Sequence, residues 1–219
     1  MNFFADIQEL NFLEELHSVF YRVKDPGTYS SDKNVINAID EWLHSKGITR
    51  ERLFHLLYKH KADDVNYACI LGVFFHYGIG VQVNRQMAFN FYQHAAKDNN
   101  DAFAQNRLGY CYRDCIGTTR NLDEAFKWFK KSAEGGHMCG MRTLAEHYYD
   151  GLGCEKNSCR AFFWYSKAYI NGNPRSIQSI SMCHEKGHGT PRDLHEALFW
   201  ARKDQDGFTS WSLLQRWFN

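Results

Sequence analysis

The chain has 219 residues, of which 44% are hydrophobic, 16% are aromatic and only three are prolines. Its 26 basic and 25 acidic side chains give a net charge of +1, which argues against nucleic acid as a partner because nucleic-acid binders carry a basic surface. No run of about 18 apolar residues is present, and the N-terminus lacks the basic and apolar segments of an export signal. We therefore expect an all-α cytoplasmic protein with no membrane insertion.

The first 61 residues predict three amphipathic helices and contain no motif that we recognise. Apolar residues at helical spacing indicate helices that begin near Asp6, Asp32 and Thr49. The turn residues Asp25-Pro26-Gly27 mark the end of the first helix. We assign residues 1–61 to an N-terminal helical segment that packs on the region that follows.

Residues 62–203 contain one pattern four times, with a period of 36 or 37 residues. The copies span 62–96, 97–133, 134–168 and 169–203. Six positions carry the pattern. In the first helix they are an aliphatic residue (Leu71, Leu108, Leu144 and Ile180) and an aromatic or His (Phe75, Tyr112, Tyr148 and His184). A glycine (Gly80, Gly117, Gly153 and Gly189) and an Asn or Asp (Asn84, Asn121, Asn157 and Asp193) follow, and then an alanine (Ala88, Ala125, Ala161 and Ala197) and a Phe or Trp (Phe91, Trp128, Trp164 and Trp200). A period of this size indicates an array of stacked structural repeats.

Each position of the pattern has a physical role in a helical hairpin. The glycines permit the positive φ that ends the first helix, and the Asn or Asp side chain caps the second. The alanine allows two helices to approach closely, and the Trp or Phe fills the space between repeats. A single hairpin cannot bury its own apolar face, so the hairpins must stack. After the array, residues 204–219 predict a short capping helix rich in Trp and Leu.

The segments LGVFFHYGIGVQVNRQMAFNFYQHAA, LGYCYRDCIGTTRNLDEAFKWFKKSA and LAEHYYDGLGCEKNSCRAFFWYSKA resemble the Sel-1-like repeat family. Cys115 stands where that family has a glycine, and the fourth copy is the weakest match. The resemblance implies a tetratricopeptide-like α-solenoid, a right-handed superhelix of antiparallel helix pairs. It also implies an adaptor that assembles other proteins. Some members carry a protein kinase domain, but this chain has no kinase signature.

Cysteine and histidine side chains offer only weak metal or catalytic candidates. Cys111 and Cys115 lie one turn apart, but they supply two ligands where structural zinc needs four. Two further groups match no zinc motif: His137, Cys139 and His147, and Cys183, His184 and His188. We expect these residues to be core and turn residues, and we assign no catalytic residue, cofactor or metal. Recognised hydrolase motifs are also missing from the sequence.

Two alternatives to an adaptor remain open. Secreted, cysteine-rich relatives have been linked to β-lactam binding or hydrolysis, and those have a regular cysteine pair in every repeat. Here the four copies hold one, two, three and one cysteines, a pattern that favours free thiols in a reducing compartment. The other alternative is an accessory subunit of a kinase or of a membrane-associated complex.

The resemblance implies that the first helix of each repeat lines the concave face of the array. The residues two before and two after the repeat leucine lie one turn apart on that helix. They give the candidate partner-binding set: Asn106, Tyr110, Arg142, Glu146, Gln178 and Met182. Polar side chains beside Tyr and Met suit a protein or peptide ligand, although any solvated helix face would carry similar residues. The sequence therefore predicts a non-enzymatic scaffold whose partner it does not name.

Overall fold

The computed structural model describes residues 3–23, 32–60, 67–98 and 100–205. Within these ranges the chain forms eleven helices and no strand, so the predicted all-α solenoid of helix pairs is confirmed. The helices are α1 (Phe3–Val23), α2 (Asp32–Lys46), α3 (Arg50–Lys59), α4 (Ala68–Tyr77), α5 (Arg85–Asp98), α6 (Ala102–Asp114), α7 (Leu122–Glu134), α8 (Met138–Asp150), α9 (Ser158–Ile170), α10 (Ser176–Lys186) and α11 (Leu194–Gln205). From residue 206 on, the predicted capping helix lies outside the described residues.

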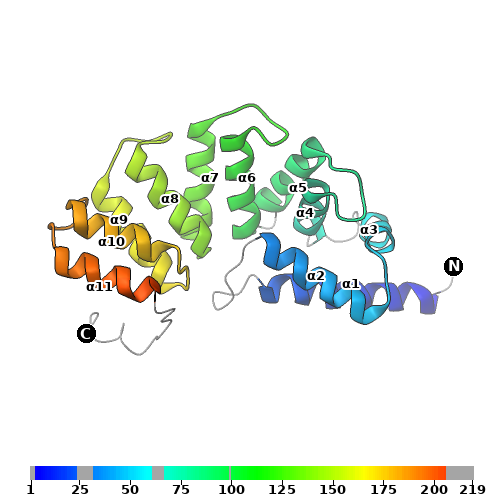
Figure 1. The fold of residues 1–219 in the computed structure, drawn as a ribbon. Helices are drawn as coiled ribbons and strands as arrows, with labels where there is room; N and C mark the ends of the chain where they lie inside the picture. Colours follow the sequence, from blue (N-terminus) through cyan, green and yellow to red (C-terminus); the bar gives the residue numbers. More distant parts are fainter. Residues whose placement is uncertain (1–2, 24–31, 61–66, 99, 206–219) are drawn as a thin grey trace. The chain divides into compact units, whose positions relative to one another are not determined.

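The chain forms two compact units, an N-terminal unit of residues 1–121 and a C-terminal unit of residues 122–219. The N-terminal unit contains α1 to α6 and the C-terminal unit contains α7 to α11. These helices are labelled in Figure 1. Each unit has its own apolar core. Fully buried side chains include Leu53, Phe74, Tyr92 and Leu108 in the first, and Phe129, Leu144, Ala161 and Cys183 in the second.

Side-chain caps fix where several helices begin. The Asn84 side chain accepts a hydrogen bond from the Met87 amide at 3.0 Å, and Asn157 accepts one from Arg160 at 2.9 Å. Asp193 accepts from the amides of the second and third residues of α11 at 2.9 and 3.1 Å. These caps confirm the predicted starts of α5, α9 and α11. In contrast, α1 begins at Phe3, three residues before the predicted start at Asp6.

Aromatic contacts join the second helix of one repeat to the first helix of the next. Three pairs of rings meet edge to face in this way. The distances between their ring centres are 5.5 Å for Phe89 and Tyr112, 5.3 Å for Phe126 and Tyr148, and 5.3 Å for Phe162 and His184. Phe54 of α3 meets Phe75 of α4 with the same geometry, at 5.4 Å and 89°. The helix α3 therefore contacts the first repeat as a second helix would.

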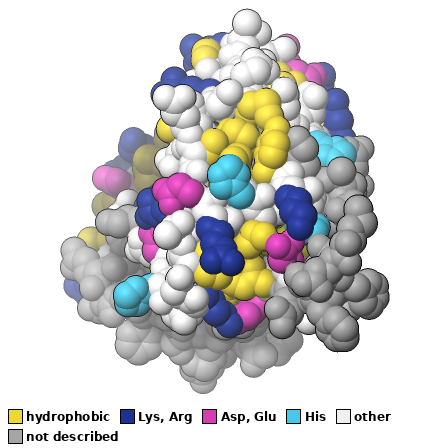
Figure 2. All heavy atoms as spheres, turned by 90° about the vertical axis from the view of Figure 1, so that its right-hand side faces the viewer, with side chains coloured by type: hydrophobic (Ala, Val, Ile, Leu, Met, Phe, Trp, Pro, Cys, Tyr) yellow, Lys and Arg dark blue, Asp and Glu magenta, His cyan; other side chains and the backbone are white. Residues whose placement is uncertain are grey.

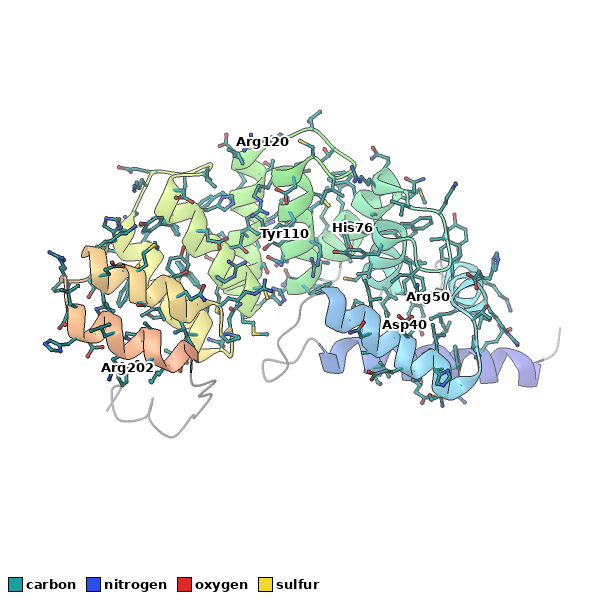
Figure 3. All side chains as sticks on the ribbon, viewed as in Figure 1. Asp40, Arg50, His76, Tyr110, Arg120 and Arg202 are labelled. Atoms are coloured by element: carbon teal, nitrogen blue, oxygen red, sulfur yellow. The ribbon has the colours of Figure 1, made fainter. Side chains whose placement is uncertain are left out.

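The second glycine of each turn also contacts the helix that precedes its hairpin. A Cβ atom on that glycine would overlap a carbonyl oxygen at the start of the preceding second helix. The pairs are Gly80 with Arg50, Gly117 with Arg85, Gly153 with Leu122, and Gly189 with Ser158. Arg50 begins α3, and its guanidinium also binds Asp40 of α2 at 2.7 Å (Figure 3). The interface between α3 and α4 thus has the same two contacts as the interfaces between later repeats, although the sequence of α3 lacks the repeat pattern.

Helix α1 packs against both α3 and the starts of the first two repeats. Phe20 meets Phe103 of α6 edge to face at 5.8 Å, and His17 lies 6.4 Å from the Tyr67 ring. Leu13, Leu16 and Phe20 are fully buried. At the other end of the helix, the Glu9 carboxylate accepts a hydrogen bond from Lys59 at 2.6 Å, and this contact lowers the pKa of Glu9.

Candidate partner-binding face

The predicted contact residues on α6 differ in accessibility. Asn106 is only 1% exposed, one turn after Phe103, whose ring contacts Phe20 of α1. Tyr110 is half-buried, and the guanidinium carbon of Arg113 lies 4.5 Å from the centre of its ring. In Figure 3, Tyr110 lies in the middle of its helix. Of the two, only Tyr110 presents surface for a partner in this structure.

On α8, Arg142 and Glu146 form an ion pair between adjacent turns. Their side chains are 19% and 32% exposed. An ion pair of this spacing near the surface contributes only about 0.3–0.5 kcal/mol, so the fold does not depend on it. Both charges are therefore accessible without being needed for stability.

On α10, Gln178 is exposed and Met182 is half-buried. The Met182 sulfur lies 4.0 Å from the hydroxyl oxygen of Tyr149, and that hydroxyl lies 2.8 Å from Nδ1 of His188. Tyr149 lies in the last turn of α8, and His188 lies in the turn after α10. The side chain of Met182 is therefore part of a small polar and aromatic cluster, which joins α8 and α10, the first helices of the third and fourth repeats.

A buried tyrosine of α9 interacts with residues of both of these helices. Tyr165 of α9 is 3% exposed and is hydrogen-bonded to Ser179 of α10. Burial raises the pKa of Tyr165 well above its usual range, and the negative charge of Glu146 on α8 raises it further. The hydroxyl therefore stays neutral at physiological pH. Tyr165 is therefore hydrogen-bonded to Ser179 of α10 and is influenced by the charge of Glu146 on α8.

We name the surface formed by these residues the α8–α10 face. It consists of Arg142, Glu146, Tyr149, Gln178, Met182 and His188. Sequence reasoning missed Tyr149 and His188. A usable signal existed for Tyr149, because the position after the repeat aromatic differs in every copy: His76, Arg113, Tyr149 and Glu185. His188 also departs from its pattern, because the other copies have Ile79, Ile116 or Leu152 at that position. Its contact with Tyr149, however, joins residues from two different repeats and could not be read from the spacing.

The cysteines and histidines that raised the question of a metal have structural roles. Nδ1 of His137 accepts a hydrogen bond from the Gly140 amide at 3.2 Å and so caps α8. His147 is fully buried, and its Nδ1 lies 2.8 Å from the Leu152 carbonyl oxygen. The ring of His184 packs on Phe162. Across the described ranges, no three His, Cys, Asp or Glu side chains gather as a metal site would require.

The thiols vary in depth. All seven cysteines lie in the described part of the chain, and none of them forms a disulfide there. Burial raises the pKa of Cys111 to about 12 and that of Cys183 to about 11. A thiol with so high a pKa is a weak nucleophile at neutral pH, because the thiolate is the reactive form. Cys111 therefore acts as a small apolar core residue.

The surface carries both signs of charge. On the side of the molecule that Figure 2 shows, basic and acidic side chains are interspersed around small hydrophobic patches. That face has no broad region of one sign. Among the helices of the described residues, none combines the length and hydropathy needed to cross a bilayer.

The stacked hairpins define an α-helical repeat protein. The family model of the Sel1 repeat matches residues 67–100, 102–137, 140–173 and 179–203, which together make up more than half of the chain. The chain therefore belongs to the Sel1 repeat family, and the four predicted repeats are confirmed.

Solved structures share this fold. A Sel1 repeat protein from Oxalobacter formigenes aligns with a TM-score of 0.70 and 22% identity, over 93% of this chain and 86% of that one. The protective antigen c5321, present in uropathogenic Escherichia coli strains and displaying an SLR fold, aligns with a TM-score of 0.70 and 20% identity. That alignment covers 88% of this chain and 45% of the antigen. Among curated proteins, none matches this chain.

Proposed function

We propose that this protein is a non-enzymatic adaptor that binds another protein along the concave, first-helix side of its repeats, with the α8–α10 face as the main contact. Membership of the Sel1 repeat family supports the adaptor role. The observation that carries the choice of surface is the cluster of Met182, Tyr149 and His188 beside the ion pair of α8. These side chains lie outside the six positions that recur in every repeat.

The chemistry of the face indicates the kind of segment that it binds. Arg142 and Glu146 offer one charge of each sign, and Gln178 offers a side-chain amide. Met182 and Tyr149 add apolar and polarizable surface that adapts to a neighbouring side chain. A short extended segment or a helix of mixed polarity fits this combination better than a polyanion does. A reducing, cytoplasmic compartment suits this protein and its partner, because the seven cysteines form no disulfide within the described residues.

The test is affinity purification from cells with three versions of the full chain, read by mass spectrometry. The first is wild type. The second replaces Tyr110, Arg142 and Gln178 by Ala, which removes an aromatic, a cation and an amide from the first helices. The third makes the matched changes Phe163→Ala, Arg202→Ala and Gln86→Ala on exposed positions of second helices.

We expect the first-helix variant to lose the proteins that both wild type and the second-helix variant retain. Circular dichroism establishes that all three chains are equally folded. If the first-helix variant recovers the same partners as wild type, then the first-helix side is not the binding surface. If the second-helix variant alone loses them, the partner binds the opposite side of the hairpins.

A further inference from the structure

Helix α1 carries its apolar and polar residues on opposite sides. Leu13, Leu16 and Phe20 are fully buried. Leu16 and Phe20 follow Leu13 by three and seven residues, so the three side chains form one stripe along the helix. Asn11 and Ser18, on the other side, are exposed. Helices that bind in a groove of another protein hold it by apolar anchors at this spacing.

The first half of α1 contacts α2 and the end of α3. The Glu9 carboxylate accepts a hydrogen bond from Lys59 at 2.6 Å, and the same oxygen lies 3.1 Å from Nε2 of His60. One turn further along, the centre of the Phe12 ring lies 4.5 Å from that of Trp42 on α2. This half of α1 is therefore held by a charged contact and an aromatic one.

The second half of α1 lies on the starts of two first helices. His17 meets Tyr67 at the start of α4, and Phe20 meets Phe103 in the first turn of α6, both edge to face. Phe103 is one turn before Asn106 on the helix that also carries the predicted partner-binding residues. We name the residues that contact α1 in these ways the α1 groove: Trp42, Lys59, His60, Tyr67 and Phe103.

The repeat stack itself is closed by α3. The carbonyl oxygen of Arg50 meets Gly80, and Phe54 meets Phe75, which are the two contacts that join every later pair of repeats. Helix α1 lies outside this series of contacts. It therefore rests on a stack whose end is already formed, as a ligand helix would.

We propose that the α1 groove is a binding site for an amphipathic helix of a partner protein, and that α1 occupies this site until such a helix displaces it. Helix α1 shows what the partner helix must present. It needs three apolar residues at the spacing of Leu13, Leu16 and Phe20, and a carboxylate four residues before the first of them, where Glu9 meets Lys59. The groove belongs to the N-terminal unit and the α8–α10 face to the C-terminal unit, so this proposal does not rest on the surface proposed above.

A fluorescent peptide of residues 3–23, added to the full chain, tests the proposal. In wild type, α1 is tethered next to the groove and competes with the peptide, so the peptide should bind weakly. Leu16→Asp in the full chain removes a buried anchor of α1 and should strengthen peptide binding about tenfold or more, because the groove is then vacant in a larger fraction of the molecules. Ser18→Asp, on the exposed side of α1, is the matched control and should leave peptide binding within about twofold of wild type.

Changes in the peptide identify its contacts in the Leu16→Asp chain. A peptide that itself carries Leu16→Asp should bind about tenfold more weakly or worse, because it lacks the same apolar anchor. A peptide with Glu9→Lys should bind about threefold more weakly, since two cations then meet at Lys59. Adding Lys59→Glu to the chain should restore the binding of that peptide. Lys59 is 55% exposed, so this substitution keeps the fold.

Four results would overturn the proposal. The first is a Leu16→Asp chain that binds the peptide no better than wild type does. The second is faster amide exchange in α4 and α6 of that chain, because α1 would then be an integral part of the core. The third is a failure of Lys59→Glu to restore the Glu9→Lys peptide, which would place the peptide elsewhere. The fourth is a wild-type dimer that Leu16→Asp dissociates, which would assign the groove to α1 of a second copy.

Discussion

The backbone of Gly153 lies against the carbonyl oxygen of Leu122, with no room for a side chain between them. Gly153 also has a φ of +65°, which L-residues with a Cβ rarely adopt. Gly153→Ala therefore combines backbone strain with a steric overlap and should lower the free energy of unfolding by about 3 kcal/mol. Urea denaturation followed by circular dichroism measures the loss.

Gly136→Ala is the control for this substitution. Gly136 has a φ of +88°, but a Cβ there would meet no atom of the described residues within 4 Å. This variant should lose only about 1 kcal/mol, the cost of the left-handed conformation alone. Equal losses at Gly136 and Gly153 would show that the contact with Leu122 does not constrain the turn.

Trp128 is 7% exposed, and the ammonium nitrogen of Lys131 lies 4.3 Å from the centre of its ring. Trp128→Ala removes a large buried side chain and should cost roughly 3–5 kcal/mol of unfolding free energy. Phe163→Ala is the matched aromatic control, because Phe163 is 57% exposed and its loss should change stability by less than about 0.5 kcal/mol. A cost below about 1 kcal/mol at Trp128 in denaturant melts would mean that this position does not hold the stack together.

Cys115 ends α6 in the left-handed conformation, with a φ of +59°, where the other repeats have Gly78, Gly151 and Gly187. Cys115→Gly should raise the free energy of unfolding by about 0.5–1 kcal/mol, since relief of strain exceeds the extra freedom that glycine gives the unfolded chain. Cys115→Ala removes the thiol but keeps the strained Cβ, so it should leave stability close to wild type. A gain in the alanine variant equal to that of glycine would assign the effect to the thiol.

Burial lowers the pKa of His76, and the nearby charge of Arg85 lowers it further. The folded state therefore favours neutral His76, and the unfolded state binds more protons between the folded pKa and the ordinary value of 6.5. Consequently, this group should reduce the free energy of unfolding as the pH falls below about 6.5, until the pH reaches the folded pKa. In urea titrations at pH 7.5 and 5.5, His76→Gln should lose less stability on acidification than wild type. Equal losses would contradict this role.

The repeat scaffold could be predicted because its signals are local. A glycine that ends one helix, an Asn84 or Asn157 that caps the next and an alanine at a close approach each leave a mark at a fixed spacing. The sequence of α3 gives almost no signal that this helix packs on the first repeat. Its contact with Gly80 uses the carbonyl oxygen of Arg50, which every residue possesses. Only Phe54 hints at the pattern, because the turn before α3 has the single Gly47 and not the G-x-G of the repeats.

The binding face was harder to predict than the scaffold because it depends on contacts between distant residues. The burial of Asn106 depends on its tertiary neighbours, which the spacing of α6 cannot reveal. The contact between Tyr149 and His188 joins the end of one helix to a turn 39 residues away. By contrast, the ion pair of Arg142 and Glu146 agrees with their spacing of four residues, since both belong to one helix.

The contact between Arg50 and Gly80 also decides where this protein can be shortened. A fragment that starts where the recognisable pattern does, near residue 62, would lack Arg50 and Phe54. Phe75 would then be exposed at the fragment's new end, and an exposed aromatic surface of this kind favours aggregation. Deletion studies that map partners should therefore keep α2 and α3, so that a loss of binding reports on the partner and not on a damaged end of the stack.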